Sequence, residues 1–298
     1  MSNNKDFKVK NGIQPTVYHE GLGTVTSGSV TVSYDVANIS FDSKTFSVAS
    51  QAEYPAGVAF KDDGTKMYVA GAAGTGTGDV FQYSLSTAWD ISTASYDSVS
   101  YSNSSITNAY TIQFKPDGTK LFIQAYEDDR VYEHTLSTAW DLSTASYNNN
   151  NLYYGGETAT AYDFHIGANG TKIYVSNNDS PMYQYTMSTA WDISTASYDS
   201  VTFAVSDQTP SDGWRVQFNA DGTKMYGMNA DDIYIYTLTT AWDISTASYD
   251  GVNYTMTNYT SHRNFVFKDD GTKIYASEGS SSGKIAQYST GSTVTTNP

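Results

Sequence analysis

The sequence predicts an all-β fold, a five-bladed β-propeller built from repeats of about 51 residues, and two short motifs support this prediction. An Ala-Trp-Asp tripeptide recurs with its tryptophans at positions 89, 140, 191 and 242, each 51 residues after the one before. An Asp/Asn-Gly-Thr-Lys motif occurs five times, with its glycines at positions 64, 118, 170, 222 and 271. A fixed period near 50 residues is typical of a propeller or a solenoid. Residues 86–99 and 188–201 are identical, so the copies are closely related.

Each repeat has the pattern of four short strands. In the copy that follows Trp89, the expected strands are residues 96–101, 109–114, 121–125 and 131–136. Their tyrosine, valine, isoleucine and phenylalanine content is typical of strands with a packed face. The hairpin Lys-Pro-Asp-Gly-Thr-Lys suits a type I turn, with Gly118 in a left-handed position. Four strands joined by tight turns form a propeller blade, and neighbouring blades must stack to bury their apolar faces.

The Ala-Trp-Asp motif has a mechanical interpretation. Burial of an indole contributes about 3 kcal/mol or more, so each tryptophan is expected to pack between blades or under the connecting loop. The aspartate is expected to accept hydrogen bonds from the backbone amides that follow it and so to act as a local cap.

The two ends of the chain predict how the ring closes. The fifth repeat stops before any Ala-Trp-Asp, and the missing part is found near the N-terminus. Asp35, Phe41 and Phe46 have the spacing of Asp90, Tyr96 and Tyr101, and Tyr34 takes the tryptophan position. We therefore expect residues 35–48 to pair with the strand at 284–290. This closure leaves no open repeat and makes five blades the expected number. The expected regions are an N-terminal arm (1–33), the propeller (34–290) and a C-terminal tail (291–298).

Composition excludes several classes of function. The 298 residues include 16 basic and 31 acidic side chains, a formal net charge of −15 that repels phosphate backbones and argues against nucleic acid as a partner. Without cysteine there is neither a disulfide framework nor a thiolate metal site. The polar segment Met1–Lys10 lacks the apolar centre of a signal peptide, and no stretch has the roughly 18 apolar residues of a membrane helix. Membrane insertion and ordinary secretory export are therefore not expected.

The N-terminal arm has two interpretations, a flexible leader or a docking segment. As a docking segment it uses three lysines that contrast with the acidic body, and three apolar residues that alternate as in a strand. These residues are Lys5, Phe7, Lys8, Val9, Lys10 and Ile13.

The segment from Phe114 to Ala145, with its Lys-Pro-Asp-Gly-Thr-Lys hairpin and its Leu-Ser-Thr-Ala-Trp-Asp-Leu-Ser-Thr-Ala connector, resembles a repeat of propeller proteins from marine tailed bacteriophages. The leader Phe7-Lys8-Val9-Lys10-Asn11-Gly12 is similar to the starts of phage virion proteins. The resemblance implies a virion component, such as a fibre, tail appendage or capsid decoration, that is made in the host cytoplasm and binds other virion proteins. It implies no catalytic residues, because such families have no agreed ones.

No catalytic motif, metal site or cofactor site is expected. We place His165 in the position of Phe60, Phe114, Phe218 and Phe267, and His134 in that of Tyr83, Tyr185, Tyr236 and Tyr288, so both are expected to be packed in the core. The acidic turns Asp128-Asp129, Asn177-Asn178-Asp179 and Asp231-Asp232 have the ligand type that calcium prefers, but they lack the ligand spacing of a calcium loop. Solvated turn carboxylates are the favoured interpretation.

Variation between the copies predicts a ligand site where the inner strands begin. Counted back from the phenylalanine position, the fourth residues are Ala56, Tyr110, Ala161, Trp214 and Arg263, and the third residues are Gly57, Thr111, Tyr162, Arg215 and Asn264. None of these ten is acidic, and Asp163 lies one step further in. From this set we select Tyr110, Tyr162, Trp214, Arg215 and Arg263 as the candidate ligand residues, because aromatic faces beside arginines suit a sugar or another polar ligand.

Three functions remain open. The first is a non-enzymatic virion structural or attachment protein that presents the propeller to a host surface or another protein. The second is a carbohydrate-binding propeller of the lectin type, which is compatible with the first. The third is a propeller hydrolase or lyase, which requires carboxylates converging on the channel.

Overall fold

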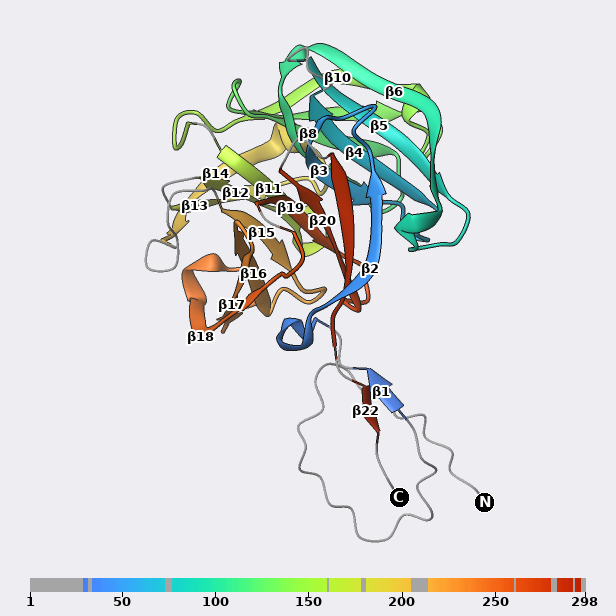
Figure 1. Cartoon of the computed structure of the whole chain (residues 1–298). Coiled ribbons are helices and arrows are strands. Elements are labelled where there is room, and N and C mark those ends of the chain that lie inside the picture. The colour runs from blue at the N-terminus through green and yellow to red at the C-terminus, as the bar shows by residue number, and fades with distance from the viewer. Residues whose placement is uncertain are drawn as a thin grey trace, which may run out of the picture.

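The fold confirms the five-bladed β-propeller. In this computed structural model the described residues are 29–31, 34–72, 77–159, 161–177, 181–204, 214–259, 261–279, 283–291 and 293–295. Figure 1 shows five sheets around a common centre, each with four antiparallel strands. Among the described residues, no helix is long and apolar enough to cross a membrane.

The blades follow one another along the chain, and we name them A to E. Blade A contains β3 (Tyr54–Phe60), β4 (Lys66–Ala72), β5 (Thr77–Leu85) and β6 (Ala94–Thr107). Blade B contains β7 (Ala109–Phe114), β8 (Lys120–Ala125), β9 (Arg130–Leu136) and β10 (Ala145–Tyr153). Blade C contains β11 (Ala161–Gly167), β12 (Lys172–Asn177), β13 (Met182–Met187) and β14 (Ala196–Phe203). Blade D contains β15 (Arg215–Phe218), β16 (Lys224–Asn229), β17 (Asp232–Leu238) and β18 (Ala247–Thr255).

Blade E is built from both ends of the chain. It contains β19 (His262–Phe267), β20 (Lys273–Glu278), β21 (Lys284–Ser289) and, as its outer strand, β2 (Ser40–Ser47). Phe41 pairs with Tyr288 and Phe46 pairs with Ile285, as Tyr96 and Tyr101 pair in blade A. The predicted closure is therefore confirmed. Next to this blade, β1 (Ser29–Thr31) pairs with β22 (Thr293–Thr295), and Figure 1 shows this two-stranded ribbon outside the disc.

In blades A to D the hairpin glycine packs on the tryptophan of the same blade, and in blade E it packs on Tyr34; blade B shows how. The backbone N–H of Trp140 donates to the carbonyl of Gly118 at 3.0 Å. A Cβ at residue 118 would collide with the indole, and residue 118 has a φ of 72°, so both the contact and the conformation require glycine. Asp141 caps the η3 turn (Leu142–Thr144) through Ser143, as predicted. Equivalent turns are η1 (Val36–Asn38), η2 (Ile91–Thr93), η5 (Ile193–Thr195) and η6 (Ile244–Thr246), and η4 (Ala168–Gly170) lies in the blade C hairpin.

Hydrogen bonds between neighbouring blades recur at two positions, although not every blade uses both. The Tyr68 hydroxyl in blade A donates to the Trp140 carbonyl in blade B at 2.6 Å, and Tyr174, Tyr226 and Tyr275 make the equivalent bond. The Gln82 side chain accepts a hydrogen bond from the Leu142 N–H, and Gln184 and Gln287 do the same for the next turn. Five apolar clusters fill the spaces between neighbouring sheets.

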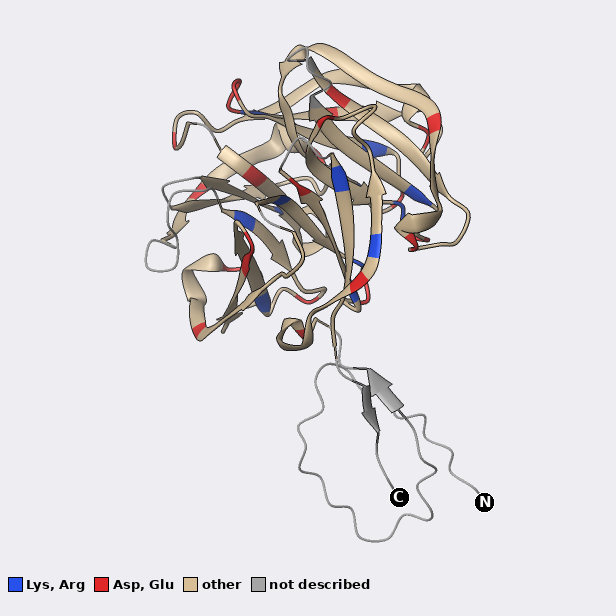
Figure 2. Ribbon diagram, viewed as in Figure 1, with Lys and Arg blue, Asp and Glu red and all other residues tan. Residues whose placement is uncertain are grey.

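Within each blade, a lysine at the start of the second strand is paired with a carboxylate. Lys66 contacts Asp97 at 3.1 Å, and the same pair is formed by Lys172–Asp199, Lys224–Asp250 and Lys273–Asp42. Figure 2 shows the charged positions spread over all the blades rather than gathered in one place.

Candidate binding sites on the two faces

The inner strands β3, β7, β11, β15 and β19 surround the central channel, and their two ends define two faces of the disc. On the crossover face, the chain passes from the outer strand of one blade to the inner strand of the next. On the hairpin face lie the Gly-Thr-Lys hairpins and the tryptophan connectors. The crossover face is the one where we predicted a ligand site.

The predicted alignment of blade C was wrong by one residue. Ile166 pairs with Ile173, just as Phe114 pairs with Leu121, so Ile166 takes the phenylalanine position and His165 takes that of Gln113. An aliphatic residue fills the space that phenylalanine fills in the other blades. The fourth and third residues back are therefore Tyr162 and Asp163, and the statement that this set contains no acidic residue is also wrong.

His134 is buried as predicted, whereas His165 packs on aromatic rings but is only partly buried and lines the cavity of the hairpin face. The His165 ring lies 5.3 Å from the ring of Phe218 and stacks on Trp242 at 6.5 Å, and its pKa is lowered to about 4 because burial disfavours the charged form. His134 pairs with Leu121 as Tyr83 pairs with Met67, and burial likewise lowers its pKa to about 4.

Three tyrosines form an aromatic cluster on the crossover face. Tyr110 stacks on Tyr126 with the ring centroids 4.7 Å apart, and Tyr162 meets both rings edge-on at 5.9 and 5.3 Å. The Tyr126 hydroxyl lies 3.4 Å from that of Tyr162. Tyr110 and Tyr162 were predicted, whereas Tyr126 was missed because it follows β8 rather than an inner strand.

Two arginines continue this cluster across the channel. The Arg215 guanidinium lies 5.1 Å from the centre of the Tyr162 ring, and its Nε donates to the Arg263 carbonyl at 2.6 Å. The Arg263 guanidinium in turn lies 6.0 Å from the centre of the Tyr54 ring. Three of the five predicted ligand residues, Tyr110, Tyr162 and Arg263, form one surface with Tyr54 and Tyr126, which we call the Tyr/Arg surface. Arg215 is only 4% exposed and supports this surface from below.

Trp214, the fifth predicted ligand residue, belongs to the core. It is 1% exposed and its ring packs on Tyr234 and Tyr236 of the same blade. A Cβ on Gly227 would collide with the indole, so glycine at this position makes room for the tryptophan. The sequence analysis placed residue 214 on the rim of the channel, but its indole points into the core of the propeller.

Asp163 lies below the Tyr/Arg surface, at the waist of the channel. It is fully buried, and its Oδ2 accepts a hydrogen bond from the Val216 N–H at 2.8 Å. Burial raises its pKa to about 7, although the Val216 N–H, the Thr111 hydroxyl and the Arg215 charge oppose this shift. An inner strand has one edge without a neighbouring strand, so its backbone groups need other hydrogen-bond partners. Asp163 supplies such a partner for the N–H of Val216 on β15.

Other polar side chains also form hydrogen bonds with backbone groups of the inner strands. The Gln113 amide bonds to both the N–H and the carbonyl of Ile166, at 2.7 and 2.9 Å. Gln124 donates to the Ala161 carbonyl at 2.6 Å, and Ser277 donates to that of Ala56 at 3.2 Å. We therefore interpret Asp163 as a residue that holds neighbouring inner strands together.

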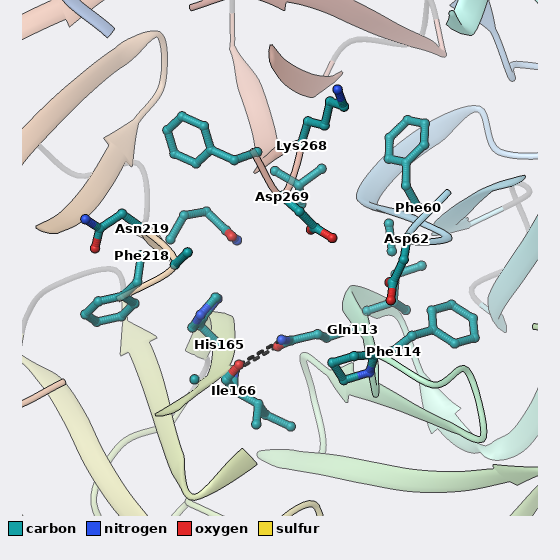
Figure 3. A pocket seen from close by; sticks show the side chains of 18 of the residues that line it. Phe60, Asp62, Gln113, Phe114, His165, Ile166, Phe218, Asn219, Lys268 and Asp269 are labelled. Carbon is teal, nitrogen blue, oxygen red and sulfur yellow. Dashed lines mark hydrogen bonds between the residues drawn. The ribbon is translucent and has the colours of Figure 1, made fainter. Parts of the chain in front are cut away.

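A funnel of about 520 Å³ opens on the hairpin face, where no site was predicted (Figure 3). Its wall is aromatic and includes Trp89, Trp140, Trp191, Trp242 and Tyr34, together with the phenylalanines beneath them. The fivefold pattern is broken two residues before each hairpin glycine, where the residues are Asp62, Pro116, Ala168, Ala220 and Asp269. Figure 3 shows the carboxylates of Asp62 and Asp269 pointing into the funnel.

The pKa values of both funnel carboxylates are raised, and the charge of Lys268 partly opposes the shift of Asp269. Partial burial and the charge of Asp269 raise the pKa of Asp62 to about 6, and the pKa of Asp269 is raised by burial and by Asp270. The sequence signal was the doubled aspartate in Lys-Asp-Asp-Gly-Thr-Lys at 61–66 and 268–273. It was passed over because the hairpin was interpreted as a turn alone.

Two of the acidic turns use their carboxylates within the protein. Asp128 and Asp231 bind groups of the protein, since the Tyr132 hydroxyl donates to Asp128 at 3.4 Å and His262 contacts Asp231 at 2.9 Å. Among the described residues, no group of three histidine or acidic side chains is placed to hold a metal ion. Asn178 and Asp179 lie outside the described residues, as do the arm residues Lys5 to Ile13.

No protein-family model and no curated protein matches this chain. Among solved structures, the chain is similar to a candidate 6-phosphogluconolactonase from Bacteroides uniformis, with 11% identity and a TM-score of 0.49 over 81% of this chain and 70% of that one. A protein of unknown function from Desulfotomaculum acetoxidans has 12% identity and a TM-score of 0.49, over 82% and 75%. A candidate 6-phosphogluconolactonase from Bacteroides fragilis has 12% identity and a TM-score of 0.46, over 82% and 70%. Similarity at this level carries no argument about activity.

Proposed function

We propose that this chain is a non-enzymatic virion structural or attachment protein that presents a propeller for binding to a host surface or another protein. The observation that carries the binding part is the Tyr/Arg surface on the crossover face. The scaffold repeats around the ring, yet among the described residues only this sector combines three tyrosines in mutual contact with neighbouring arginines. The virion part is supported by the resemblance of the repeats and the leader to phage proteins.

The chemistry of the Tyr/Arg surface favours a polar ligand with apolar faces, and a carbohydrate has both. Tyrosine rings stack on the C–H faces of a sugar while their hydroxyls bond to its oxygens. Arg263 adds donors for hydroxyl or carboxylate oxygens. A lectin-type propeller is therefore the second candidate function, and it uses the same surface.

Binding by the Tyr/Arg surface is tested with host-cell surfaces and a panel of polysaccharides. Tyr162→Ala and Arg263→Gln should each weaken binding by about tenfold or more, since a lost stacking or charged contact contributes about 1.4 kcal/mol or more. Tyr153→Ala is a matched control, because Tyr153 also lies against an arginine, Arg130 at 4.6 Å, but on an outer strand. Equal losses in all three variants would contradict a dedicated surface. Turnover of any polysaccharide or ester that Asp163→Asn abolishes would support the hydrolase or lyase instead.

The arm is proposed to dock the propeller to other virion proteins. Removal of residues 1–20 leaves the closing strand β2 in place, so the propeller should fold normally but fail to join particles. Normal incorporation of the shortened chain would place the attachment surface on the disc.

A further inference from the structure

We propose that the funnel on the hairpin face is a binding site for an alkylammonium group, and that Asp62 and Asp269 are its charged residues. The group is either a free amine or the side chain of a lysine. This inference uses the face opposite the Tyr/Arg surface and does not depend on what that surface binds.

The shape of the site comes from the propeller itself. Blades E and A are neighbours in the closed ring, since β20 of blade E reaches the carbonyl of Ala56 on β3. Asp62 and Asp269 occupy equivalent hairpin positions in these two blades, so closure brings the two carboxylates to one side of the funnel. The matching positions in the other blades are Pro116, Ala168 and Ala220, which are uncharged.

The protein balances the charge of this sector only in part, through the field of Lys268 on Asp269. Each hairpin has its own lysine, but Lys61 pairs with Asp63 at 2.7 Å and Lys268 pairs with Asp270 at 2.6 Å. Among the residues that the structure describes, neither Asp62 nor Asp269 has an ion-pair partner. The two carboxylates repel each other, and a cation placed between them removes that repulsion.

The aromatic wall decides which cation fits. The Phe60 and Trp89 rings, 5.4 Å apart, form the wall next to Asp62. The wall already accepts a cation, because the Lys268 ammonium lies 5.5 Å from the centre of a Trp89 ring. An alkylammonium combines a charge for the carboxylates with a stem for the rings, whereas a hydrated metal ion gains nothing from an aromatic face.

Titration of the full-length protein with N-acetyl-lysine-N-methylamide, followed by calorimetry and by tryptophan fluorescence, tests the site. The probe should bind, and its uncharged isostere N-acetyl-norleucine-N-methylamide should bind at least about tenfold more weakly. Asp62→Asn combined with Asp269→Asn should weaken binding of the lysine probe by about tenfold or more. Ala220→Asp, which adds a carboxylate at the equivalent position of blade D, should tighten it.

The control is Glu53→Gln combined with Glu127→Gln, which changes the net charge equally on the other face and should leave binding of the probe unchanged. The proposal is overturned if the norleucine isostere binds as well as the lysine probe, if both double variants lose the same affinity, or if calcium displaces the probe. Tyr162→Ala should leave this binding intact, so failure here is distinct from failure of the Tyr/Arg surface.

Discussion

Replacement of Trp140 by alanine is the most direct test of how the blades are held together. Trp140 is 9% exposed, and its ring lies on Gly118 and 5.1 Å from the ring of Phe114. On its other side it faces Tyr68 of the preceding blade at 6.4 Å. The indole therefore connects a hairpin, a core cluster and a neighbouring blade.

The magnitude follows from the area that the indole removes from water. A tryptophan side chain buries roughly 200 Å², which at about 25 cal/mol per Å² sets an upper bound near 5 kcal/mol. Measured losses for tryptophan-to-alanine changes in cores are about 3–5 kcal/mol. The left-handed backbone at residue 140, with a φ of 64°, is unchanged by alanine, so the loss should come from packing alone. We expect a loss of about 3–5 kcal/mol.

The assay is urea unfolding followed by near- and far-ultraviolet circular dichroism. Trp191→Ala should cost less than Trp140→Ala, because Trp191 is more exposed and has Ile166 in place of a phenylalanine. Gly118→Ala should be harmful alone, since its Cβ meets the indole, but should cost less in the Trp140→Ala background. A loss below about 1 kcal/mol, or additive costs for residues 118 and 140, would refute the reasoning.

Two further predictions concern buried polar groups. The folded-state pKa of Asp163, about 7, lies above its ordinary value of 3.8, so its ionisation destabilises the fold. Asp163 should therefore contribute a fall in stability as pH rises from about 4 to about 7, so the stability of the protein relative to Asp163→Asn should decrease over this range; a difference that does not change with pH in thermal unfolding would contradict the assignment. Gln82→Met should destabilise by about 1–3 kcal/mol, because it leaves the buried Leu142 N–H without its acceptor. Ile235→Gln, at the equivalent position of blade D, should cost much less in urea unfolding, because no such bond exists there to lose.

The fold was predictable because the same sequence pattern occurs in each of the repeats. Four tryptophans at a fixed spacing and five hairpin glycines at nearly the same period leave few alternatives, and Phe41 and Phe46 are enough to place the closing strand. The packing of glycine against tryptophan was not predictable in detail. It depends on two residues that both have positive φ and are more than 20 positions apart, such as Gly118 and Trp140.

The sites were predicted only in part, because position in a repeat does not fix the direction of a side chain. Tyr162 and Arg263 lie on the rim as expected, whereas Trp214 at an equivalent position turns into the sheet. In blade C, the aromatic ring of His165 was aligned with the phenylalanine of the other blades, but that position is occupied by Ile166. The funnel was missed because its carboxylates lie in hairpins that are fully explained as turns.

A difference between the repeats indicates a ligand site only when no other change in the blade restores the lost contact. In blade B, Phe122 replaces the tyrosine that bonds to the next tryptophan carbonyl, and Lys120 makes that bond instead at 2.7 Å. In blade A an amide, Gln82, bonds to a carboxylate, Asp97. In blade B the two groups are exchanged, since Glu133 takes the first position and Asn148 the second, and the hydrogen bond between them is kept at 2.6 Å. Such changes preserve the scaffold and say nothing about a ligand.

Asp62 and Asp269 behave in the opposite way. Among the described residues neither carboxylate has an ion-pair partner, and the charge of Asp269 raises the pKa of Asp62. Proline or alanine at the same position serves the hairpin equally well, as Pro116 and Ala220 show. The hairpin therefore does not require the two carboxylates, and their place at one side of an aromatic funnel is better explained by a bound cation than by the requirements of the fold.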